Sequence, residues 1–123
     1  MNKPKIMIVD DSELMRTLIK EVLSKYDLEI IEAENGRIAL IKFEELQPDL
    51  ILLDITMPEM DGITFLNNIP KDKVKVIMLS ALGQRAIVLD CLKKGAVSYI
   101  VKPFEESQLI KTISKFIKLV SKN

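Results

Sequence analysis

The sequence lacks histidine and is nearly free of cysteine, two residue types that carry much of metal and redox chemistry. Its 123 residues include no histidine and a single cysteine, Cys91. Without histidine, the chain cannot form histidine metal sites or use histidine as an acid or base. One cysteine cannot make an internal disulfide, which fits a reducing cytoplasm. The ligands of any metal site must therefore be oxygen atoms.

Two further absences exclude classes of partner. The 18 Lys and Arg residues balance 18 Asp and Glu residues, so the chain has no basic excess of the kind that nucleic-acid-binding proteins show. No apolar run approaches the roughly 20 residues of a membrane-spanning helix, and no signal-peptide core follows the N-terminus. We expect a cytoplasmic protein without nucleic-acid or membrane partners. Its length and 48% hydrophobic content predict one globular domain over residues 1–123.

Short apolar runs alternate with segments of helical spacing, which predicts an α/β fold with a parallel sheet. The expected strands are Lys5 to Val9, Leu28 to Ile31, Leu50 to Leu53, Val74 to Leu79 and Val97 to Val101. The second run is mixed in polarity and is expected at an edge, whereas the third is the most apolar and is expected at the centre. Right-handed crossovers on both faces would give a doubly wound three-layer sandwich with five helices.

The helices are placed by apolar stripes and by helix-ending residues. The second helix opens at Asn35-Gly36 and ends at Pro48, the third spans about Ile63 to Ile69, and the fourth runs from about Gln84 to Lys94 before Gly95. The expected inward residues are Leu14, Met15, Leu18, Ile19, Val22 and Leu23 of the first helix and Ala39, Leu40, Phe43 and Leu46 of the second. In the last helix a stripe of Leu109, Ile110, Ile113, Phe116, Ile117 and Val120 predicts three turns.

Four of the five strands end in charged or reactive residues, namely Asp10-Asp11, Asp54, Ser80 and Lys102. The carboxyl ends of parallel strands form the edge at which open α/β sheets bind ligands. Each residue alone has a simpler interpretation, since Asp and Ser cap helices and turns and Lys is commonly a solvated surface charge. Together, however, they predict one shared site.

The carboxylates of such a site need a counter-charge. Two carboxylates about 4 Å apart repel by roughly 4 kcal/mol at an effective dielectric constant of about 20, which exceeds the ~1 kcal/mol that a capping interaction returns. Oxygen ligands with an incomplete protein shell suit Mg²⁺, and Lys102 supplies a second positive charge. A cation, a lysine, a hydroxyl and a nucleophilic carboxylate form a site suited to a phosphoryl group.

These residues resemble the signature of response regulator receiver domains. The resemblance rests on Asp10-Asp11, on Asp54 with Met57-Pro58-Glu59-Met60-Asp61-Gly62, on Ser80-Ala81 and on Lys102-Pro103-Phe104, and it covers the chain from about Lys5 to Val120. Within the family, the chain is most similar to stand-alone chemotaxis regulators of the CheY type. The strand order 2-1-3-4-5 of the flavodoxin-like fold is carried over from this family, which is itself a standard example of that sheet.

The resemblance implies a role for each site residue. Asp54 would accept a phosphoryl group from a phosphohistidine of a sensor histidine kinase, as in two-component systems. Asp11, Asp54 and the backbone carbonyl of Thr56 would bind Mg²⁺ directly, and Asp10 would act through water. Lys102 and Ser80 would contact phosphoryl oxygens, and the Lys102-Pro103 peptide would be cis.

The resemblance also implies a switch. Ser80 would move toward the phosphoryl group, and Tyr99 would then rotate inward and reshape the face formed by the fourth helix, fifth strand and fifth helix. The inward stripe of the fourth helix is formed by Ile87, Val88, Cys91 and Leu92. The apolar residues Ala86 and Leu89 lie off this stripe and hint at a partner surface there. The expected output partner is a flagellar motor switch protein or another output protein, and a phosphatase is a further expected partner. The apolar Leu82 cannot position an attacking water, which favours slow self-dephosphorylation.

Two alternatives remain at this point. The first alternative to a chemotaxis regulator is a stand-alone or truncated receiver of a phosphorelay outside chemotaxis. An aspartyl-phosphate phosphatase or mutase would need an acid two residues after a nucleophile on the first strand, and a cap domain, neither of which the sequence shows. We therefore expect no turnover enzyme, but a protein that catalyses only its own phosphorylation and dephosphorylation. A flavin carrier is discarded, because Asp10-Asp11 would repel the flavin phosphate.

Overall fold

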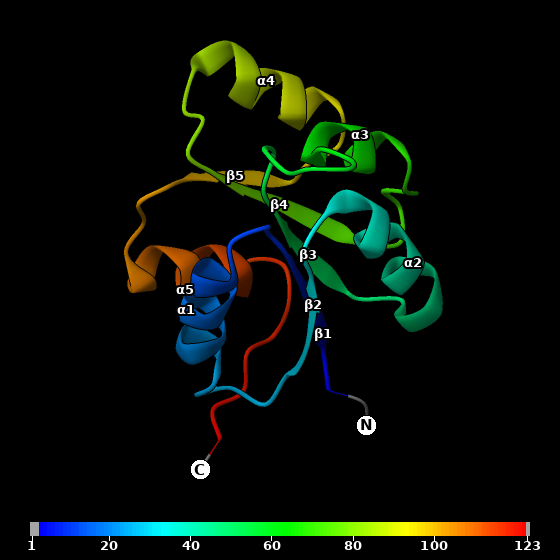
Figure 1. Ribbon diagram of the computed structural model, residues 1–123. Helices are drawn as coiled ribbons and strands as arrows, with labels where there is room; N and C mark the ends of the chain where they lie inside the picture. The colour runs from blue at the N-terminus through cyan, green and yellow to red at the C-terminus, as the bar shows by residue number, and fades with distance from the viewer. Residues whose placement is uncertain (1–2, 123) are drawn as a thin grey trace.

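A computed structural model describes residues 3–122. Five strands alternate with five helices along the chain (Figure 1). The strands are β1 (Lys5–Val9), β2 (Glu29–Ala33), β3 (Leu50–Leu53), β4 (Lys75–Ser80) and β5 (Ser98–Val101). The helices are α1 (Glu13–Leu23), α2 (Gly36–Leu46), α3 (Gly62–Asn67), α4 (Arg85–Lys93) and α5 (Glu106–Ser114). The sheet is parallel with the order β2-β1-β3-β4-β5, which confirms the predicted doubly wound fold.

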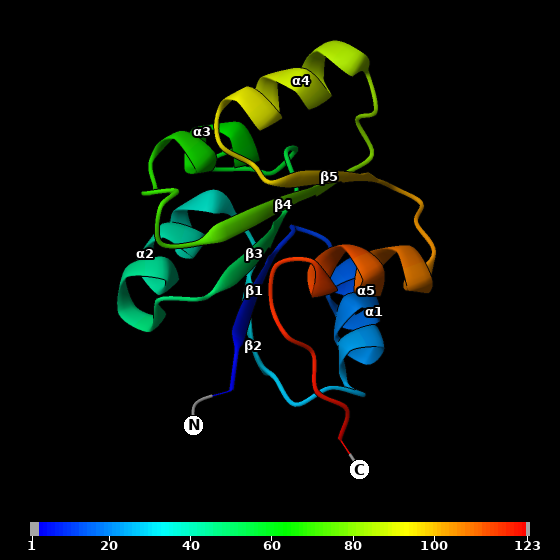
Figure 2. The ribbon, with the colours of Figure 1, turned by 180° about the vertical axis from the view of Figure 1, so that it is seen from behind.

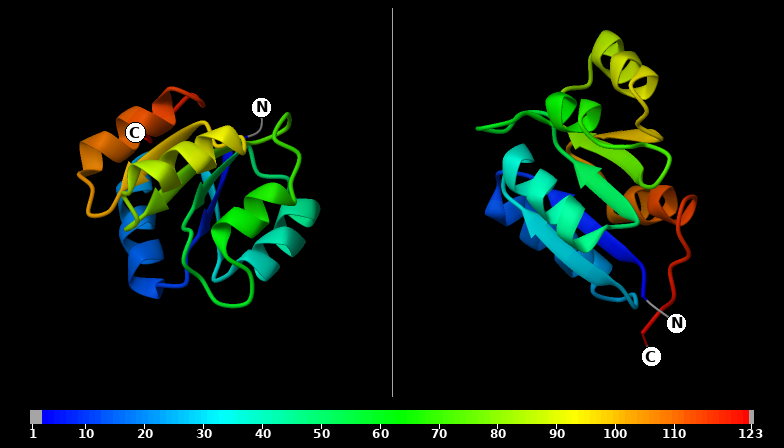
Figure 3. Two further views of the ribbon diagram at one scale, coloured as in Figure 1. Left: turned by 90° about the horizontal axis from the view of Figure 1, so that it is seen from above. Right: turned by 90° about the vertical axis from the view of Figure 1, so that its right-hand side faces the viewer.

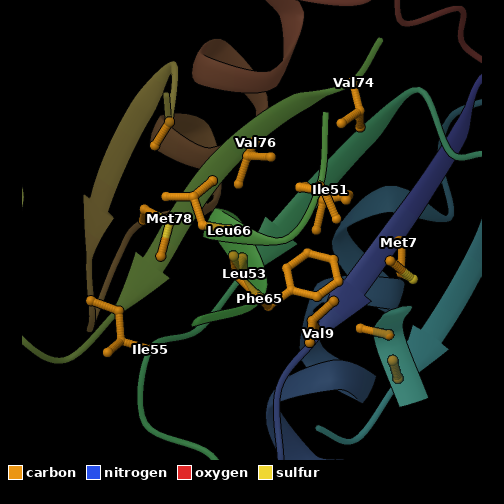
Figure 4. Packing of buried hydrophobic residues seen from close by; sticks show 14 of the residues in the cluster. Met7, Val9, Ile51, Leu53, Ile55, Phe65, Leu66, Val74, Val76 and Met78 are labelled. Carbon is orange, nitrogen blue, oxygen red and sulfur yellow. The ribbon is translucent and has the colours of Figure 1, made fainter. Parts of the chain in front are cut away.

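The sheet separates two layers of helices. Helices α1 and α5 cover one face, and α2, α3 and α4 cover the other (Figures 1 and 3). Alternate residues of the central strands enter two hydrophobic clusters, so that Met7 and Val9 pack toward α2 and α3 while Ile6 and Ile8 pack toward α1 and α5. Figure 4 shows the first cluster, in which the ring of Phe65 lies over the strands. Burial on both faces explains the continuous apolar runs of these strands.

Strand register brings the site residues to one edge of the sheet. Val9 of β1 is paired with Leu53 of β3, so the residues that follow them, Asp10 and Asp54, leave neighbouring strands at the same level. The backbone N–H of Asp54 donates to the Val9 carbonyl at 2.9 Å, and that of Lys102 donates to the Ser80 carbonyl at 2.8 Å. The parallel register therefore creates the shared edge that the sequence predicts.

The predicted inward stripes are wrong at their margins. Leu14 and Leu18 of α1 are 70% and 45% exposed, and Leu46 of α2 is 37% exposed. Helix α1 contacts the core mainly through Ile19 and Leu23, because the sheet and α5 cover only one side of it. In these helices, apolar spacing thus overestimates the width of the buried face. One strand boundary also differs, since β2 lies further along the chain than the predicted Leu28 to Ile31.

The last helix is shorter than predicted. Helix α5 ends at Ser114, whereas the apolar stripe continues to Val120. The following chain turns back toward the α1–β2 loop (Figure 2), where the Asp27 N–H donates to the Val120 carbonyl at 2.7 Å and Tyr26 forms an antiparallel bridge with Ser121. The side chains of residues 116, 117 and 119 still pack on the core. The apolar pattern beyond α5 is therefore satisfied by packing without further helix, except at Val120, which is 51% exposed.

None of the helices within residues 3–122 is both long and apolar enough to cross a bilayer.

Candidate functional site

Three carboxylates converge at the carboxyl edge of the sheet. One oxygen each from Asp10, Asp11 and Asp54 lies within 4.8 Å of the others. Asp10 and Asp54 are buried and Asp11 is exposed, so the group opens to solvent on one side. Clustered carboxylate oxygens are the donor set of a hard divalent cation. The residues present therefore fit Mg²⁺.

Lys102 reaches this group from the end of β5. Its Nζ lies 2.7 Å from Asp10 Oδ2 and 3.2 Å from Asp54 Oδ2, and its side chain is only 15% exposed. Burial by itself lowers the pKa of Lys102, but the hydrogen bond and charge of Asp10, together with the charge of Asp54, outweigh it and raise that pKa above its usual value. The lysine is therefore held protonated, and it neutralises one of three negative charges.

Backbone N–H groups orient two of the three carboxylates. Asp10 Oδ1 accepts from the Ser12 N–H at 2.9 Å, at the point where Ser12 caps α1, and Asp54 Oδ1 accepts from the Ile55 N–H at 2.7 Å. Within residues 3–122, the Asp11 carboxylate has neither a hydrogen bond nor an ion pair of these kinds. Asp11 is therefore the carboxylate with the most free coordinating capacity.

Ser80 and Tyr99 are connected through the backbone of Leu82. Ser80 Oγ is buried and accepts from the Leu82 N–H at 3.2 Å. The Tyr99 hydroxyl donates to the Leu82 carbonyl, and its ring packs against the core on the α4 side of the sheet. Burial raises the pKa of Tyr99, which keeps its hydroxyl protonated. Tyr99 thus contacts the β4–α4 loop directly.

The loop that carries Thr56 is held by two glycines. A Cβ on Gly62 would lie 2.0 Å from the Asp54 carbonyl oxygen, and a Cβ on Gly36 would lie 2.5 Å from the Met60 carbonyl oxygen. The Gly36 N–H donates to that Met60 carbonyl at 3.1 Å. The sequence marks Gly36 as the start of the second helix and Gly62 as a loop residue, but it gives no sign of this packing role. At the opposite side of the site, the Lys102-Pro103 peptide is cis.

Sequence reasoning also missed Arg16. Its Nη1 donates to the Asp10 carbonyl at 2.6 Å, so a residue of α1 touches the backbone of the site. The sequence contains no clear signal for this contact, because a basic residue on a surface helix normally faces solvent.

Helix α4 exposes the two apolar residues that the sequence places off its inward stripe, and further apolar residues are exposed beside them. Ala86 is exposed and Leu89 is 49% exposed, as expected for residues off the inward stripe of α4. Leu92, which was expected within the stripe, is 39% exposed, and Val101 of β5 is 41% exposed. Helix α4 and β5 therefore present several apolar side chains to solvent.

The fold and this site define a family. The model of the response regulator receiver domain matches residues 6–114, and the chain belongs to that family. It is a phosphoacceptor response regulator of the CheY-like type.

Several relatives with high identity to this chain are chemotaxis proteins. The chemotaxis protein CheY of Listeria monocytogenes is 49% identical over 117 residues, which cover 93% of this chain and 98% of that protein. The chemotaxis protein CheY of Bacillus subtilis is 46% identical over 114 residues, which cover 90% of this chain and 95% of that protein. Among solved structures, the Borrelia burgdorferi CheX–CheY–BeF₃–Mg²⁺ complex contains a similar chain with 36% identity and a TM-score of 0.85, covering 94% of this chain and 90% of that one.

Proposed function

We propose that Asp54 is the phosphoacceptor and receives its phosphoryl group from a phosphohistidine of a sensor histidine kinase. The observation that carries this proposal is the convergence of Asp10, Asp11 and Asp54 around one space that also contains the amine of Lys102. In the transfer, an Asp54 carboxylate oxygen forms a bond to phosphorus while the bond from phosphorus to the histidine nitrogen breaks. The imidazole leaves with the electron pair of that bond.

The other site residues have separate tasks. Asp10, Asp11, Asp54 and the Thr56 carbonyl would hold Mg²⁺, which when bound neutralises charge on the phosphoryl oxygens. Lys102 is protonated and already lies 3.2 Å from Asp54, so its ammonium group can pair with an oxygen of the phosphoryl group. The Ser80 hydroxyl can donate its proton to another oxygen, because its present bond with Leu82 uses only the oxygen as acceptor.

The switch follows from that last contact. If Ser80 turned toward the phosphoryl group, the Leu82 N–H would lose its acceptor and the loop before α4 would shift. Tyr99 is bound to the carbonyl of the same residue and would move with the loop. The face that changes is the one formed by α4, β5 and α5, where Leu89 and Val101 are exposed. Phosphorylation adds nearly two negative charges, which supply the driving force.

Chemotaxis is the proposed pathway, and a flagellar motor switch protein is the proposed output partner. The support is the near full-length likeness to chemotaxis proteins CheY. Binding of the purified switch protein should require the beryllofluoride-treated protein and should weaken when Leu89 is replaced by aspartate. A beryllofluoride-treated protein that ignores the switch protein would favour an output outside chemotaxis.

The phosphoacceptor assignment is tested by intact mass after incubation with Mg²⁺ and a small acyl phosphate. The wild type should gain one phosphoryl group, and Asp54→Asn should gain none. Asp72→Asn is a matched control, because Asp72 is an exposed carboxylate between α3 and β4 and lies outside the site. Equal labelling of the wild type and Asp54→Asn would refute the assignment.

A further inference from the structure

Arg16 connects the site to the edge of the sheet. Its Nη1 donates to the Asp10 carbonyl at 2.6 Å, and its Nε donates to Glu32 Oε1 at 2.9 Å. The side chain is only 12% exposed although it begins on the surface helix α1. One planar guanidinium thus holds the β1–α1 loop and strand β2 in a fixed relation.

Glu32 is itself fixed from the other side. Lys20 Nζ lies 2.8 Å from Glu32 Oε2, while Lys42 Nζ donates to the Glu32 backbone carbonyl. The hydrogen bond from Lys20 is the main cause that lowers the pKa of Glu32, and Arg16 adds to it. The anchor of Arg16 therefore remains ionised and ordered at neutral pH.

The carbonyl that Arg16 binds belongs to the peptide between Asp10 and Asp11. A peptide group is planar, so fixing its oxygen also fixes the direction in which the Asp11 backbone leaves. The Asp10 N–H donates to the Ala33 carbonyl at 3.1 Å, which holds the preceding peptide in the same way. Asp11 is exposed and its carboxylate has no partner of its own within residues 3–122. Its direction therefore depends on the backbone.

We propose that Arg16 is a positioning residue that presents Asp11 to Mg²⁺ by holding the Asp10–Asp11 peptide, with Glu32 as its anchor. This inference rests on the proposed function, in which Asp11 binds the metal. Within residues 3–122, Arg16 has no hydrogen bond or ion pair with the three carboxylates, so it acts through the backbone. A lysine at this position would lack the planar fork that bonds the carbonyl and Glu32 at once.

Charge and position predict opposite effects, which makes the proposal testable. If Arg16 acted only through its charge, removing a cation beside the site would strengthen Mg²⁺ binding. If it positions Asp11, removing it should weaken binding, by about tenfold as for other residues that orient metal ligands. The sign of the change decides between the two roles.

The experiment is calorimetric titration with Mg²⁺ at constant ionic strength, on wild type, Arg16→Met and Lys20→Met. Lys20→Met is the matched control, because it removes the same charge and another Glu32 partner without touching Asp10. We expect the Mg²⁺ dissociation constant to rise about tenfold in Arg16→Met and to stay equal or fall in Lys20→Met. Unchanged or tighter binding by Arg16→Met, or an equal loss in Lys20→Met, would overturn the proposal.

Two further measurements separate positioning from damage to the fold. The thermal midpoint without Mg²⁺ shows whether Arg16→Met is folded, and Arg16→Lys takes its place if it is not, with a smaller loss expected. At saturating Mg²⁺ the initial rate of phosphoryl gain from an acyl phosphate should return to the wild-type value, whereas a persistent defect would contradict pure positioning. A wild type that binds no Mg²⁺ would instead refute the proposed function itself.

Discussion

Two charged clusters lie side by side at the carboxyl edge of the sheet. In one, carboxylates outnumber basic side chains, and in the other, basic side chains outnumber carboxylates. The rim cluster contains three carboxylates, Asp10, Asp11 and Asp54, and one cation, Lys102, which pairs with Asp10 and Asp54. The Glu32 cluster contains Arg16 and Lys20, which bind the Glu32 carboxylate, and Lys42, which binds the Glu32 backbone carbonyl. In the second cluster each of these side chains has a partner, whereas in the first Asp11 has none within residues 3–122. Of these two clusters, the one that keeps an excess of negative charge is the one where a cation and a phosphoryl group are proposed to bind.

The two clusters also differ in burial, which sets the strength of their interactions. The side chains of Lys102 and Asp10 are 15% and 3% exposed, but those of Lys20 and Glu32 are 41% and 34% exposed. Coulomb interactions strengthen as the surroundings lose water. Changes in the rim cluster should therefore affect stability more than equivalent changes in the Glu32 cluster.

The largest effect on stability is expected for Lys102→Met. Without Mg²⁺, this change leaves Asp10 and Asp54 buried without a cation and should lower the free energy of unfolding by about 3 kcal/mol. Saturating Mg²⁺ should restore much of the loss, because it replaces the missing charge. Urea unfolding with and without Mg²⁺ measures both values. For comparison, Lys20→Met should cost less than about 1 kcal/mol, and an equal cost for the two lysines would remove the distinction between the clusters.

The opposite sign is expected for Asp11→Asn. In the metal-free protein this change removes a repelling charge without breaking a bond, so the free energy of unfolding should rise by about 1 kcal/mol, a modest value because the exposed carboxylate is screened by water. With Mg²⁺ the order should reverse, since only the wild type keeps the full ligand set and gains binding energy. Thermal unfolding over a Mg²⁺ series shows the crossover. Parallel curves with no crossing would argue against a metal ligand at position 11.

The rim cluster was predictable from the sequence, whereas the Glu32 cluster was not. Asp10, Asp54, Ser80 and Lys102 each follow an apolar run, and parallel strands necessarily bring such positions to one edge. Arg16 and Glu32 meet only because α1 packs across the edge strand, a contact between surface positions that no periodic pattern encodes. The close approach of the buried Gly36 to the Met60 carbonyl was also hidden, because it is a tertiary contact between α2 and the loop after β3.

The fold itself was predicted more completely than its boundaries. Apolar runs such as Leu50 to Leu53 are buried on both faces, and few alternatives satisfy them. The end of α5 was wrong because Ile117 is packed equally well by a helix or by a returning segment. The bonds of residues 120–122 to the α1–β2 loop decide between these two conformations, and they are tertiary contacts.

The smallest effect is expected for Glu32→Gln, and it depends on pH. Because the folded state lowers the pKa of Glu32, the unfolded state binds the extra proton first as the pH falls. The stabilisation from this ionised carboxylate is therefore present above its ordinary pKa and is lost as the pH drops through the lowered folded value. Glu32→Gln should cost about 0.5 kcal/mol at pH 7, a figure that allows for solvent screening of this part-exposed group.

At acid pH the gap between wild type and Glu32→Gln should close. Unfolding free energies from urea titrations at neutral pH and near pH 3 test this, with Glu45→Gln as a control, because Glu45 is exposed and makes no ion pair within residues 3–122. A difference that persists unchanged at acid pH would mean that Glu32 stabilises the protein by packing and not by charge. In that case the charge of Glu32 would not be needed to hold Arg16 in place, and Glu32→Gln should leave the Mg²⁺ affinity unchanged.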